Sequence, residues 1–462
     1  MSTSPVTTVR GRFDLVSGWG VGSRSAARIE RVETQEGLER IVQGVMESPA
    51  RILPRGLGRS YGDAAQCAGG TILDCTSLDR VVEADLDHGR LRVEAGMSLD
   101  ALLALVVPAG WFVPVTPGTR HVTIGGAIAA DVHGKNHHRD GAFGTHVEQL
   151  SLITARGRFD VGPTTQSDLY WATVGGVGLT GTIVEATLRL HPIESGLMTV
   201  DTLRAGDLDE CMAELAASDD RYRYSVAWVD CVARGRHLGR SVLSRGDHAR
   251  LSDLPPRVKQ PLTYRSTTSL NVPMTAPFNL VSAAAVRAGN ELWYRKAPAR
   301  RLGELQSLSS FFYPLDAVGN WNRLYGPRGF TQYQFVVPFG EEQAIRKCIE
   351  YLHAHQIAPS LGVLKRFGDS DLAPLSFPIP GWTLALDLPL GGRKIGCVLD
   401  GLDELVAEAH GRVYLAKDGR LRPEIFKTMY PRLDDWLETR AQHDPTGVFA
   451  SDLSRRLGIT AE

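Results

Sequence analysis

The chain has 462 residues, with 51 Lys and Arg against 52 Asp and Glu, and a formal net charge of −1. A composition of 43% hydrophobic and 22% charged residues excludes a disordered chain, and the balanced charge argues against nucleic acid as the main partner, because phosphate binding needs a basic face. The length allows roughly three domains of about 150 residues, or two larger ones.

Neither a leader peptide nor a membrane-spanning helix is expected. Residues 1–12 are rich in Ser and Thr and lack an apolar core. The stretches 101–119 and 266–286 are uncharged, but prolines and polar residues interrupt them, so neither is expected to cross a membrane. Six scattered cysteines with no Cys-x-x-Cys pair argue against a zinc ribbon or a disulfide framework.

The first two hundred residues alternate short strands and helices with Gly-rich turns. Hydrophobic periodicity and turn residues predict the following elements: strands at 71–74 and 91–94 separated by an acidic turn, a helix at 99–107, a hairpin of 150–154 with 157–161, and a strand at 183–190. His191 and Pro192 end that last strand, which predicts a domain boundary near residue 196.

The second half of the sequence has a different pattern of predicted elements. Its predicted elements are a helix at 208–217, strands at 222–229, 332–338, 361–367 and 382–388, helices at 341–355, 398–410 and 422–429, and a further helix around Trp436. Between them, residues 244–300 show little periodicity, and a loop of this length is usually a functional cover or disordered.

Glycine is unusually frequent, with 48 residues, and the densest cluster lies at 54–63. Glycines allow positive φ and close backbone approach, so successive N–H groups can converge on an anion such as a diphosphate. The spacing G-x-G-x-x-x-G differs from the dinucleotide fingerprint, and an ordinary Gly-rich turn remains an alternative. Two more clusters, at 117–138 and 171–181, place further small residues where a flat ligand can lie against backbone.

These clusters resemble the FAD domain of the vanillyl-alcohol-oxidase-type flavoproteins. Within that group the chain is similar to the decaprenylphosphoryl-ribose oxidases. The matching segments run over nearly the whole chain: 17–20, 55–62, 117–127, 133–138, 175–181, 291–296, 321–327, 332–335, 374–382, 416–418 and 449–452.

The resemblance implies an α+β fold with a two-part FAD-binding domain of the vanillyl-alcohol-oxidase or PCMH type. Residues 8–196 would form its first part, and residues 411–462 would return to it. Residues 197–410 would form an α+β substrate domain with an antiparallel sheet. Because the stretch 244–300 is irregular, we hypothesise that it is a mobile lid that gates the pocket and meets a polyprenyl tail at a membrane surface, and a disordered surface loop is the alternative.

The resemblance also implies a reaction. FAD-dependent oxidation of the 2′-hydroxyl of decaprenylphosphoryl-β-D-ribofuranose would give the 2′-ketone, the first half of an epimerisation to the arabinose donor for cell-wall arabinan. A separate nicotinamide-dependent keto-reductase would complete it. The protein would lie peripherally at the cytoplasmic or periplasmic face of the inner membrane. The alternatives are an FAD oxidase of a soluble sugar alcohol or aldonolactone, and a non-catalytic carrier of a lipid-linked sugar.

Many members of the wider group attach FAD covalently through a His, where this chain has Arg59. Arg cannot form that bond, so non-covalent FAD is expected. The residues expected to bind it are Pro54, Arg55, Gly56, Leu57, Gly58, Arg59, Ser60, Tyr61, Gly62, Asp63, Ala64, Gly118, Thr119, Thr123, Ile124, Gly125, Gly126, Ala130, Asp131, Val132, His133, Gly178, Ile183 and Tyr414.

Two residues are candidates for the catalytic base. His133 stands near His137 and His138, but no cysteine lies close in sequence, and no metal site is expected. A lone Lys after a strand, such as Lys417, is usually solvated. The resemblance instead places Lys417 on the sugar hydroxyl, where a Lys serves as a base only if its pKa is lowered. The sequence does not choose between Lys417 and His133.

The expected substrate-binding residues are Tyr61, Trp228, Gln332, Gln334, Lys365, Phe367 and Ala385. Gln332 and Gln334 alternate on one strand and so face one side. Lys365 shares its parity with apolar neighbours, and a sugar phosphate is a reasonable partner for it. Ala385 stands where some members of the family carry a Cys beside the flavin.

Overall fold

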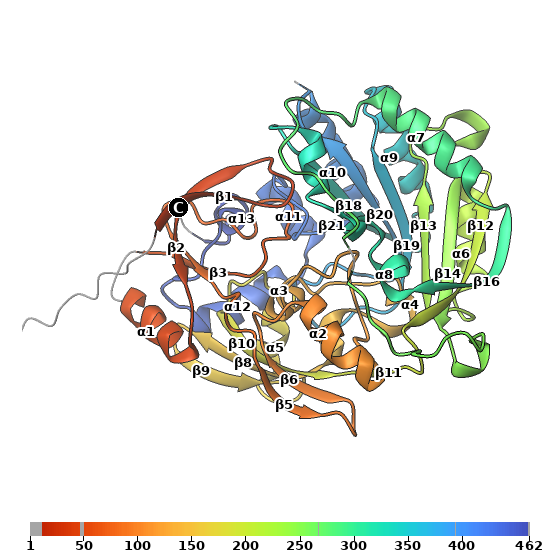
Figure 1. The fold of residues 1–462 in the computed structure, drawn as a ribbon. Helices are drawn as coiled ribbons and strands as arrows, with labels where there is room; N and C mark the ends of the chain where they lie inside the picture. The colour runs from red at the N-terminus through yellow and green to blue at the C-terminus, as the bar shows by residue number, and fades with distance from the viewer. Residues whose placement is uncertain (1–11, 47–49, 267, 393, 461–462) are drawn as a thin grey trace, which may run out of the picture.

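The computed structural model describes residues 12–46, 50–266, 268–392 and 394–460. Its helices and strands are arranged around three main sheets (Figure 1). The smallest of these has the order β1-β2-β4-β3, formed by β1 (Arg12–Ser17), β2 (Arg24–Arg31), β4 (Thr71–Asp74) and β3 (Ile52–Arg55). The helix α1 (Gln35–Met46) buries Leu38, Val42 and Val45 in the apolar cluster that also contains Ile52 and Leu73.

The second sheet is antiparallel and belongs to the same half of the molecule. Its order is β5 (Val81–Asp85), β6 (Arg90–Glu94), β10 (Thr182–Arg189), β8 (Val147–Thr154) and β9 (Gly157–Val161). The connections between these strands contain α2 (Leu99–Val106), η1 (Val107–Ala109), β7 (Trp111–Phe112), α3 (Ile124–Ala129), α4 (His137–Asp140), η2 (Phe143–His146) and α5 (Ser167–Thr173), and β11 (His191–Pro192) follows β10.

The third sheet has eight antiparallel strands. Their order is β16 (Arg300–Ser307), β12 (Leu197–Ala205), β14 (Ser241–His248), β13 (Tyr224–Val229), β19 (Leu361–Phe367), β20 (Gly381–Pro389), β18 (Phe330–Pro338) and β21 (Arg412–Val413). The helices α6 (Leu208–Ala216), α9 (Glu342–Ala354) and α10 (Ile395–Glu408) pack on one face, where alternate strand residues such as Phe335, Leu364 and Leu384 are fully buried.

The remaining elements lie in the connections between these strands or follow the last of them. They are η3 (Gly235–His237), η4 (Leu251–Asp253), β15 (Leu270–Asn271), α7 (Ala283–Lys296), α8 (Leu308–Phe312), η5 (Pro314–Ala317), β17 (Val318–Gly319), η6 (Trp321–Tyr325), α11 (Pro423–Met429), α12 (Leu433–His443) and α13 (Asp452–Arg456). Among the described residues, none of the helices is both long and apolar enough to cross a lipid bilayer.

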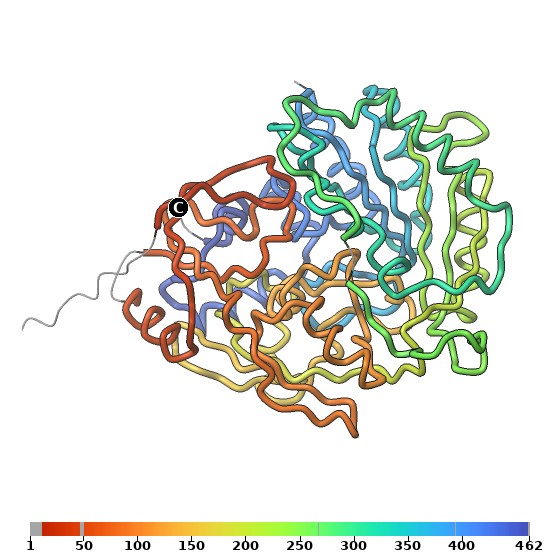
Figure 2. The backbone as a smooth tube through the Cα atoms, in the orientation of Figure 1, coloured from red at the N-terminus to blue at the C-terminus, as the bar shows by residue number. Residues whose placement is uncertain are grey.

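The first strands and the last described segment meet in the first half of the molecule, where the C-terminal segment runs among the N-terminal strands (Figure 2). Phe449 forms a parallel bridge with Ile52. The indole N–H of Trp436 on α12 donates to the Ala172 carbonyl at 2.8 Å. A two-part FAD domain with boundaries at 196 and 410 stays a prediction, and this contact between the ends supports it.

The α+β class is confirmed, and most predicted elements are present, but two local predictions are wrong. The acidic turn between the strands at 71–74 and 91–94 contains β5, an edge strand whose residues are largely exposed and therefore give no apolar alternation. The irregular stretch 244–300 contains the end of β14 and the whole of α7. The helix α7 buries only Val286 and Asn290, so its apolar periodicity is too weak to predict a helix from the sequence.

An ion cluster fastens the C-terminal helix α13 to the Gly-rich segment 54–63 and to the segment that follows β21. The Arg456 guanidinium on α13 donates to Asp63 at 2.8 and 2.9 Å and to Asp418 at 2.9 Å. Both carboxylates are buried. Gly62 permits this closure, because a Cβ there would lie 1.7 Å from the Asp418 carbonyl oxygen. We call Asp63, Asp418 and Arg456 the clasp.

We expect Arg456→Leu to lower the free energy of unfolding by about 3 kcal/mol, because it leaves two buried carboxylates without a counter-ion. Urea unfolding at pH 7 measures this change. The matched control is Arg422→Leu, which removes an exposed pair with Glu404 and should cost less than about 1 kcal/mol. An equal loss in the two variants would contradict a special role for the clasp.

Candidate active site

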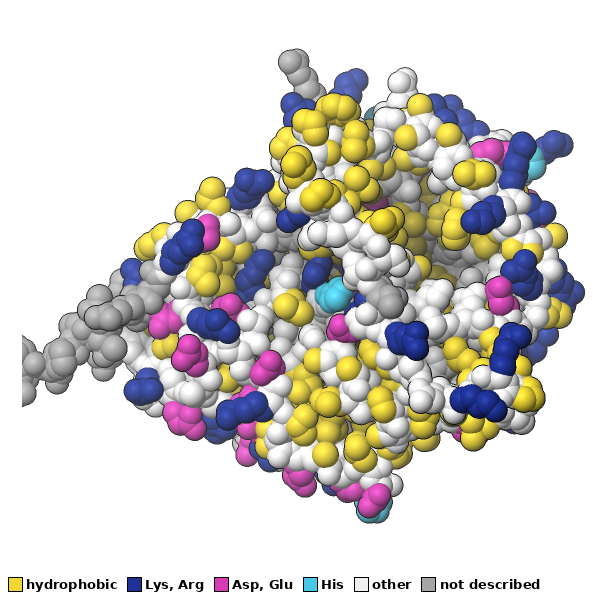
Figure 3. All heavy atoms as spheres, in the orientation of Figure 1, with side chains coloured by type: hydrophobic (Ala, Val, Ile, Leu, Met, Phe, Trp, Pro, Cys, Tyr) yellow, Lys and Arg dark blue, Asp and Glu magenta, His cyan; other side chains and the backbone are white. Residues whose placement is uncertain are grey.

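A cavity of about 590 Å³ lies between the Gly-rich half and the eight-stranded sheet. The surface is hollowed at the middle of the face shown in Figure 3. Most of the wall comes from five parts of the chain, residues 54–65, 117–133, 173–183, 315–321 and 414–417, together with one face of the eight-stranded sheet. The cavity therefore draws on segments that are far apart in the sequence.

The Gly-rich loop lies against the N-terminal end of α3. A Cβ at Gly56 would lie 2.1 Å from the Thr123 hydroxyl oxygen, so only glycine permits this approach. The Thr123 hydroxyl in turn caps α3 by accepting from the Gly126 N–H at 3.2 Å. At Gly118, by contrast, a Cβ would meet no atom within 4 Å, so open space lies in front of this backbone. Together these segments form a wall of exposed backbone.

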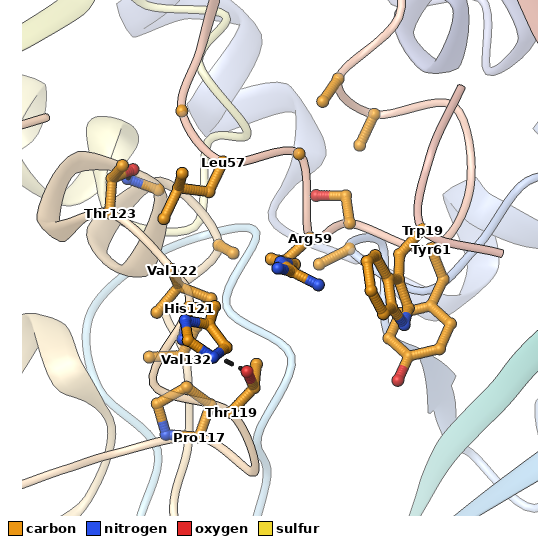
Figure 4. A pocket seen from close by; sticks show the side chains of 18 of the residues that line it. Trp19, Leu57, Arg59, Tyr61, Pro117, Thr119, His121, Val122, Thr123 and Val132 are labelled. Carbon is orange, nitrogen blue, oxygen red and sulfur yellow. Dashed lines mark hydrogen bonds between the residues drawn. The ribbon is translucent and has the colours of Figure 1, made fainter. Parts of the chain in front are cut away.

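Arg59 points into the space between this wall and the aromatic pair Trp19 and Tyr61 (Figure 4). Its guanidinium carbon lies 3.9 Å from the centroid of the Trp19 ring. The Nε atom is buried and has no hydrogen-bond partner among the described residues. Burial lowers the Arg59 pKa, and the charge of Asp316 opposes this effect. A buried donor without a partner fits an anionic ligand.

The cavity fits the expected FAD. Its volume is that of a large ligand site, the glycine backbone is open to a flat dinucleotide, and Arg59 supplies a charged donor. Most predicted cofactor residues line it, namely Pro54, Arg55, Gly56, Leu57, Gly58, Arg59, Ser60, Tyr61, Ala64, Gly118, Thr119, Thr123, Gly125, Gly126, Ala130, Val132, His133, Gly178, Ile183 and Tyr414.

Four predicted cofactor residues do not line the cavity. Gly62 and Asp63 belong to the clasp contacts. Ile124 is fully buried in the apolar core behind α3. Asp131 is fully buried too, where it accepts from the Gly144 N–H at 3.0 Å and from the Ser376 hydroxyl at 2.5 Å. These four residues support the walls and do not line the cavity.

His133 is held from both ring nitrogens. The Gln334 amide nitrogen lies 2.9 Å from Nε2, and the Lys365 Nζ lies 3.1 Å from Nδ1. The ring packs against Phe367 and Tyr414, with centroid distances of 4.7 and 5.6 Å. Burial, reinforced by neighbouring positive charges beginning with Lys365, holds the His133 pKa well below its usual range. His133 is therefore neutral near pH 7.

Lys417 lies at the cavity wall with its amine unpaired. Its Nζ sits 3.9 Å from the centroid of the Tyr61 ring, and no group among the described residues accepts a hydrogen bond from it. The backbone is fixed because the Tyr61 N–H donates to the Ala416 carbonyl at 2.9 Å. Burial lowers the Lys417 pKa to about 7, although the charge of Asp387 opposes this shift. The amine is thus available to a ligand.

Two more lysines, each half-buried, lie on the same side. Burial lowers the pKa of Lys365 to about 7, with contributions from the charges of Lys417 and Lys135. Burial also lowers the pKa of Lys135 to about 7. Lys135 donates to the Phe311 carbonyl and does not line the cavity. This end of the cavity is therefore cationic when the lysines are protonated, which suits an anionic ligand.

The register between neighbouring strands determines which residues of the eight-stranded sheet lie side by side on the cavity wall. Gln334 pairs with Ala385, which pairs in turn with Val363, and all three line the cavity. In the next row Gln332 pairs with Asp387 and donates to its carboxylate at 2.6 Å. The prediction that Gln332 and Gln334 share a face is confirmed, because both line the cavity.

Two predicted substrate residues, Trp228 and Phe367, do not line the cavity. Phe367 is buried and packs on the His133 ring, so it acts through that ring. Trp228 is paired with Val363 in register, and its ring lies 6.4 Å from that of Trp293 on α7. It lies on the path from the sheet wall toward the α7 surface.

Several lining or supporting residues escaped the sequence analysis. Trp19 and Trp321 lie inside segments that match the family, but nothing in the sequence shows that they flank the cavity. Asp387 lies two residues after Ala385 on the same strand, so the alternation of side chains along that strand could have predicted that both face the same side. Asp316 sits in a region without periodicity, and it accepts from the Arg120 backbone N–H at 2.9 Å.

The three histidines at 133–138 are engaged separately. His137 accepts from the Gly368 N–H at 3.2 Å, and the His138 Nε2 lies 3.0 Å from the Tyr222 carbonyl oxygen. Among the described residues, no group of three or more His, Cys, Asp or Glu side chains is placed to hold a metal ion. The histidines thus support the wall rather than converge.

Known proteins resemble the chain over its whole length. Residues 26–162 match the FAD binding domain model, and residues 398–457 match that of D-arabinono-1,4-lactone oxidase. A decaprenylphosphoryl-beta-D-ribose oxidase of Mycolicibacterium smegmatis is 43% identical over 468 residues, covering 99% of this chain and 100% of that protein. An uncharacterised Streptomyces coelicolor protein is 42% identical over 371 residues, 79% of this chain and 100% of its own. The predicted FAD-type fold and the FAD cofactor are confirmed.

We expect the FAD to be released by acid, because the loop carries Arg59 and a guanidinium forms no covalent bond to the cofactor. Precipitation of the purified protein with trichloroacetic acid should leave the yellow colour in the supernatant. A yellow pellet, with flavin fluorescence in the washed protein, would contradict non-covalent binding.

Proposed function

We propose a specific reaction for this chain, which belongs to the family of the decaprenylphosphoryl-beta-D-ribose oxidase and is an FAD-dependent oxidoreductase. In this reaction the protein oxidises the 2′-hydroxyl of a decaprenylphosphoryl-β-D-ribofuranose to the 2′-ketone. The observation that carries this proposal is the cavity end formed by Lys417, Lys365 and neutral His133. An alcohol needs a base there, and an anionic substrate needs a cation.

FAD, when bound, supplies the two-electron acceptor that the oxidation of an alcohol requires. The residues that would hold it are the glycine segments at 54–62 and 117–126, with Arg59 as the charged donor. Tyr61, Tyr414 and Val132 also line the cavity beside the loop.

Lys417 is the proposed base. Its amine has no hydrogen-bond partner among the described residues, and its pKa of about 7 leaves a large neutral fraction near pH 7. As the carbonyl forms, the neutral Nζ takes the hydroxyl proton and becomes an ammonium. The nearby Asp387 carboxylate then stabilises that ammonium.

His133 is the proposed positioning residue. Both of its ring nitrogens already face protein groups, Gln334 and Lys365. Its pKa lies well below the usual range, which makes it a weaker base than Lys417. The ring instead orients Gln334 and Lys365 toward the sugar.

Lys365 is the proposed contact for the sugar phosphate. An anion beside it would favour the protonated amine and raise its pKa above the value of about 7 that burial imposes. Gln332, Gln334 and Tyr61 would then contact the sugar hydroxyls, and Ala385 would leave room beside the ring.

The proposed product defines the next step. A 2′-ketone becomes the arabinose epimer only if a separate reductase delivers a reducing equivalent from a nicotinamide to the opposite face of the ring. We therefore propose a nicotinamide-dependent keto-reductase as partner, and peripheral contact with the inner membrane, at its cytoplasmic or periplasmic face, because the substrate is lipid-linked.

A second candidate function is the oxidation of an aldonolactone or a soluble sugar alcohol. The match of residues 398–457 to D-arabinono-1,4-lactone oxidase favours it. Against it stand the half-buried lysines, since a neutral lactone needs no cation. A carrier that uses FAD only structurally would need no base at Lys417.

Anaerobic flavin reduction tests the proposal. We expect prenylphosphoryl ribose to bleach the flavin absorbance of the wild-type protein, whereas ribose and D-arabinono-1,4-lactone leave it unchanged at equal concentration, because they offer nothing to Lys365. Bleaching by the lactone alone would establish the second candidate. Bleaching by none of the three would support the carrier.

We expect Lys417→Ala to slow flavin reduction by at least about 10²-fold while FAD stays bound, because the variant lacks the base. Stopped-flow absorbance under anaerobic conditions measures the rate, and the bound flavin spectrum is the control. In the wild type, the rate should rise with pH around pH 7, as Lys417 loses its proton.

Asp387→Asn separates the base from its neighbour. The Asp387 charge raises the Lys417 pKa, so its removal should move the rise in rate to lower pH. Asn can still accept the hydrogen bond from Gln332. An unchanged profile in this variant would show that another group sets it.

A further inference from the structure

The stretch 254–303 differs in charge from the rest of the chain. The whole protein is balanced, yet this stretch has a single acidic residue, Glu291. Its basic residues are all exposed: Arg257, Lys259, Arg265, Arg287, Arg295, Lys296, Arg300 and Arg301. In the described part of the chain only Arg295 and Arg301 form an ion pair with an acidic group. The stretch therefore carries a strong local positive charge.

The same stretch exposes large apolar side chains. Between 49% and 72% of each is accessible to solvent, and they are Leu270, Met274, Phe278, Leu280, Leu292, Trp293 and Leu302. Apolar and basic side chains gather in Figure 3 over the part of the molecule where α7 runs in Figure 1. We call these apolar residues and the eight basic ones the docking surface.

One side of α7 holds it to the protein, and the other side is left outward. Asn290 donates to Asp230 at 2.8 Å, the Arg240 guanidinium pairs with Glu291 at 2.6 Å, and the Tyr294 hydroxyl donates to the Ala205 carbonyl at 3.2 Å. Leu292, Trp293 and Lys296 have no such anchor and are exposed. The helix is thus fixed in place with an apolar and basic side toward solvent.

The docking surface adjoins the mouth of the cavity. On the two-residue strand β15, Leu270 is exposed while its neighbour Asn271 lines the cavity. Leu315, which lies just before the β17 partner of β15, is 40% exposed and also lines the cavity. A lipid chain leaving the cavity here would pass directly onto apolar side chains.

We propose that the docking surface binds the headgroup region of an anionic phospholipid bilayer, so that the cavity mouth opens at the level of the lipid headgroups. The inference deepens the proposed function, on which it rests, by naming the surface and the lipid class. Basic residues meet anionic headgroups, and exposed Trp, Phe and Leu side chains enter the interface. The Trp side chain is favoured at this depth.

A second copy of the chain fits this surface poorly. A two-fold dimer would bring the same basic residues opposite one another, and like charges across an interface are unfavourable. The single charge sign instead complements a membrane surface.

Co-sedimentation with vesicles tests the proposal, using phosphatidylcholine alone and phosphatidylcholine mixed with phosphatidylglycerol. We expect the FAD-bound protein to bind the anionic vesicles at least tenfold more tightly, with the difference shrinking at high salt. Leu292→Ser with Trp293→Ser, and Arg287→Glu with Lys296→Glu, should each weaken that binding at least tenfold.

The matched controls keep the same chemistry elsewhere on the surface. Phe13→Ser with Leu15→Ser removes two exposed apolar side chains of β1, and Lys347→Glu with Lys427→Glu makes the same change in net charge. Both should bind as the wild type does. Equal loss in test and control variants, or no preference for anionic vesicles, would overturn the proposal, as would a dimer that the α7 variants dissociate.

Activity separates this inference from the proposed function. The α7 variants should oxidise prenylphosphoryl ribose embedded in anionic vesicles at least tenfold more slowly than the wild type, and a short-chain analogue in solution at an unchanged rate. Equal loss on both substrates would overturn the inference. A wild type that binds vesicles but oxidises neither substrate would reject the proposed function and leave the docking surface intact.

Discussion

The buried clasp of Arg456 with Asp63 and Asp418 is the contact on which the rest of the site depends. It joins the Gly-rich loop, the segment that carries Lys417 and the last helix, which come from opposite ends of the chain. The amine of Lys417 reaches the Tyr61 ring only because the backbone of one segment is bonded to the other. Desolvated carboxylates are costly without their partner, so the closed cavity and the correct placement of its base are coupled to one guanidinium.

Burial also creates the chemistry of the site. An exposed Lys is protonated at pH 7 and cannot accept a proton. Inside the wall, loss of hydration brings Lys417 and Lys365 to the point where both charge states are accessible. The same loss of hydration keeps His133 neutral, so its ring is a fixed hydrogen-bonding partner. Loss of hydration thus shifts the pKa of all three groups, and their proposed roles differ because only Lys417 has a nitrogen without a hydrogen-bond partner among the described residues.

The local pattern of apolar, polar and glycine residues predicted many of the helices and strands. The residues whose roles depend on contacts between distant segments could not be predicted in this way. The period of two along β18 placed Gln332 and Gln334 on one face without any structure, and glycine clustering marked the cofactor wall. The strand β5 and the helix α7 were missed because neither buries an apolar stripe. Trp19 and Asp316 were missed as wall residues because their roles come from segments that meet only in the folded chain. Trp228 and Phe367 were expected on the wall, and their side chains lie behind or beside it.

Ala385 on the sheet wall has a pharmacological consequence. A Cys at this position would offer a nucleophile to an electrophilic inhibitor, whereas this wall offers a methyl group. Among the described lining residues the remaining thiol is Cys75, whose pKa burial raises to about 12, so it is not a thiolate at neutral pH. Compounds that owe their potency to an irreversible sulfur adduct would therefore find no thiolate at neutral pH among the described lining residues of this wall.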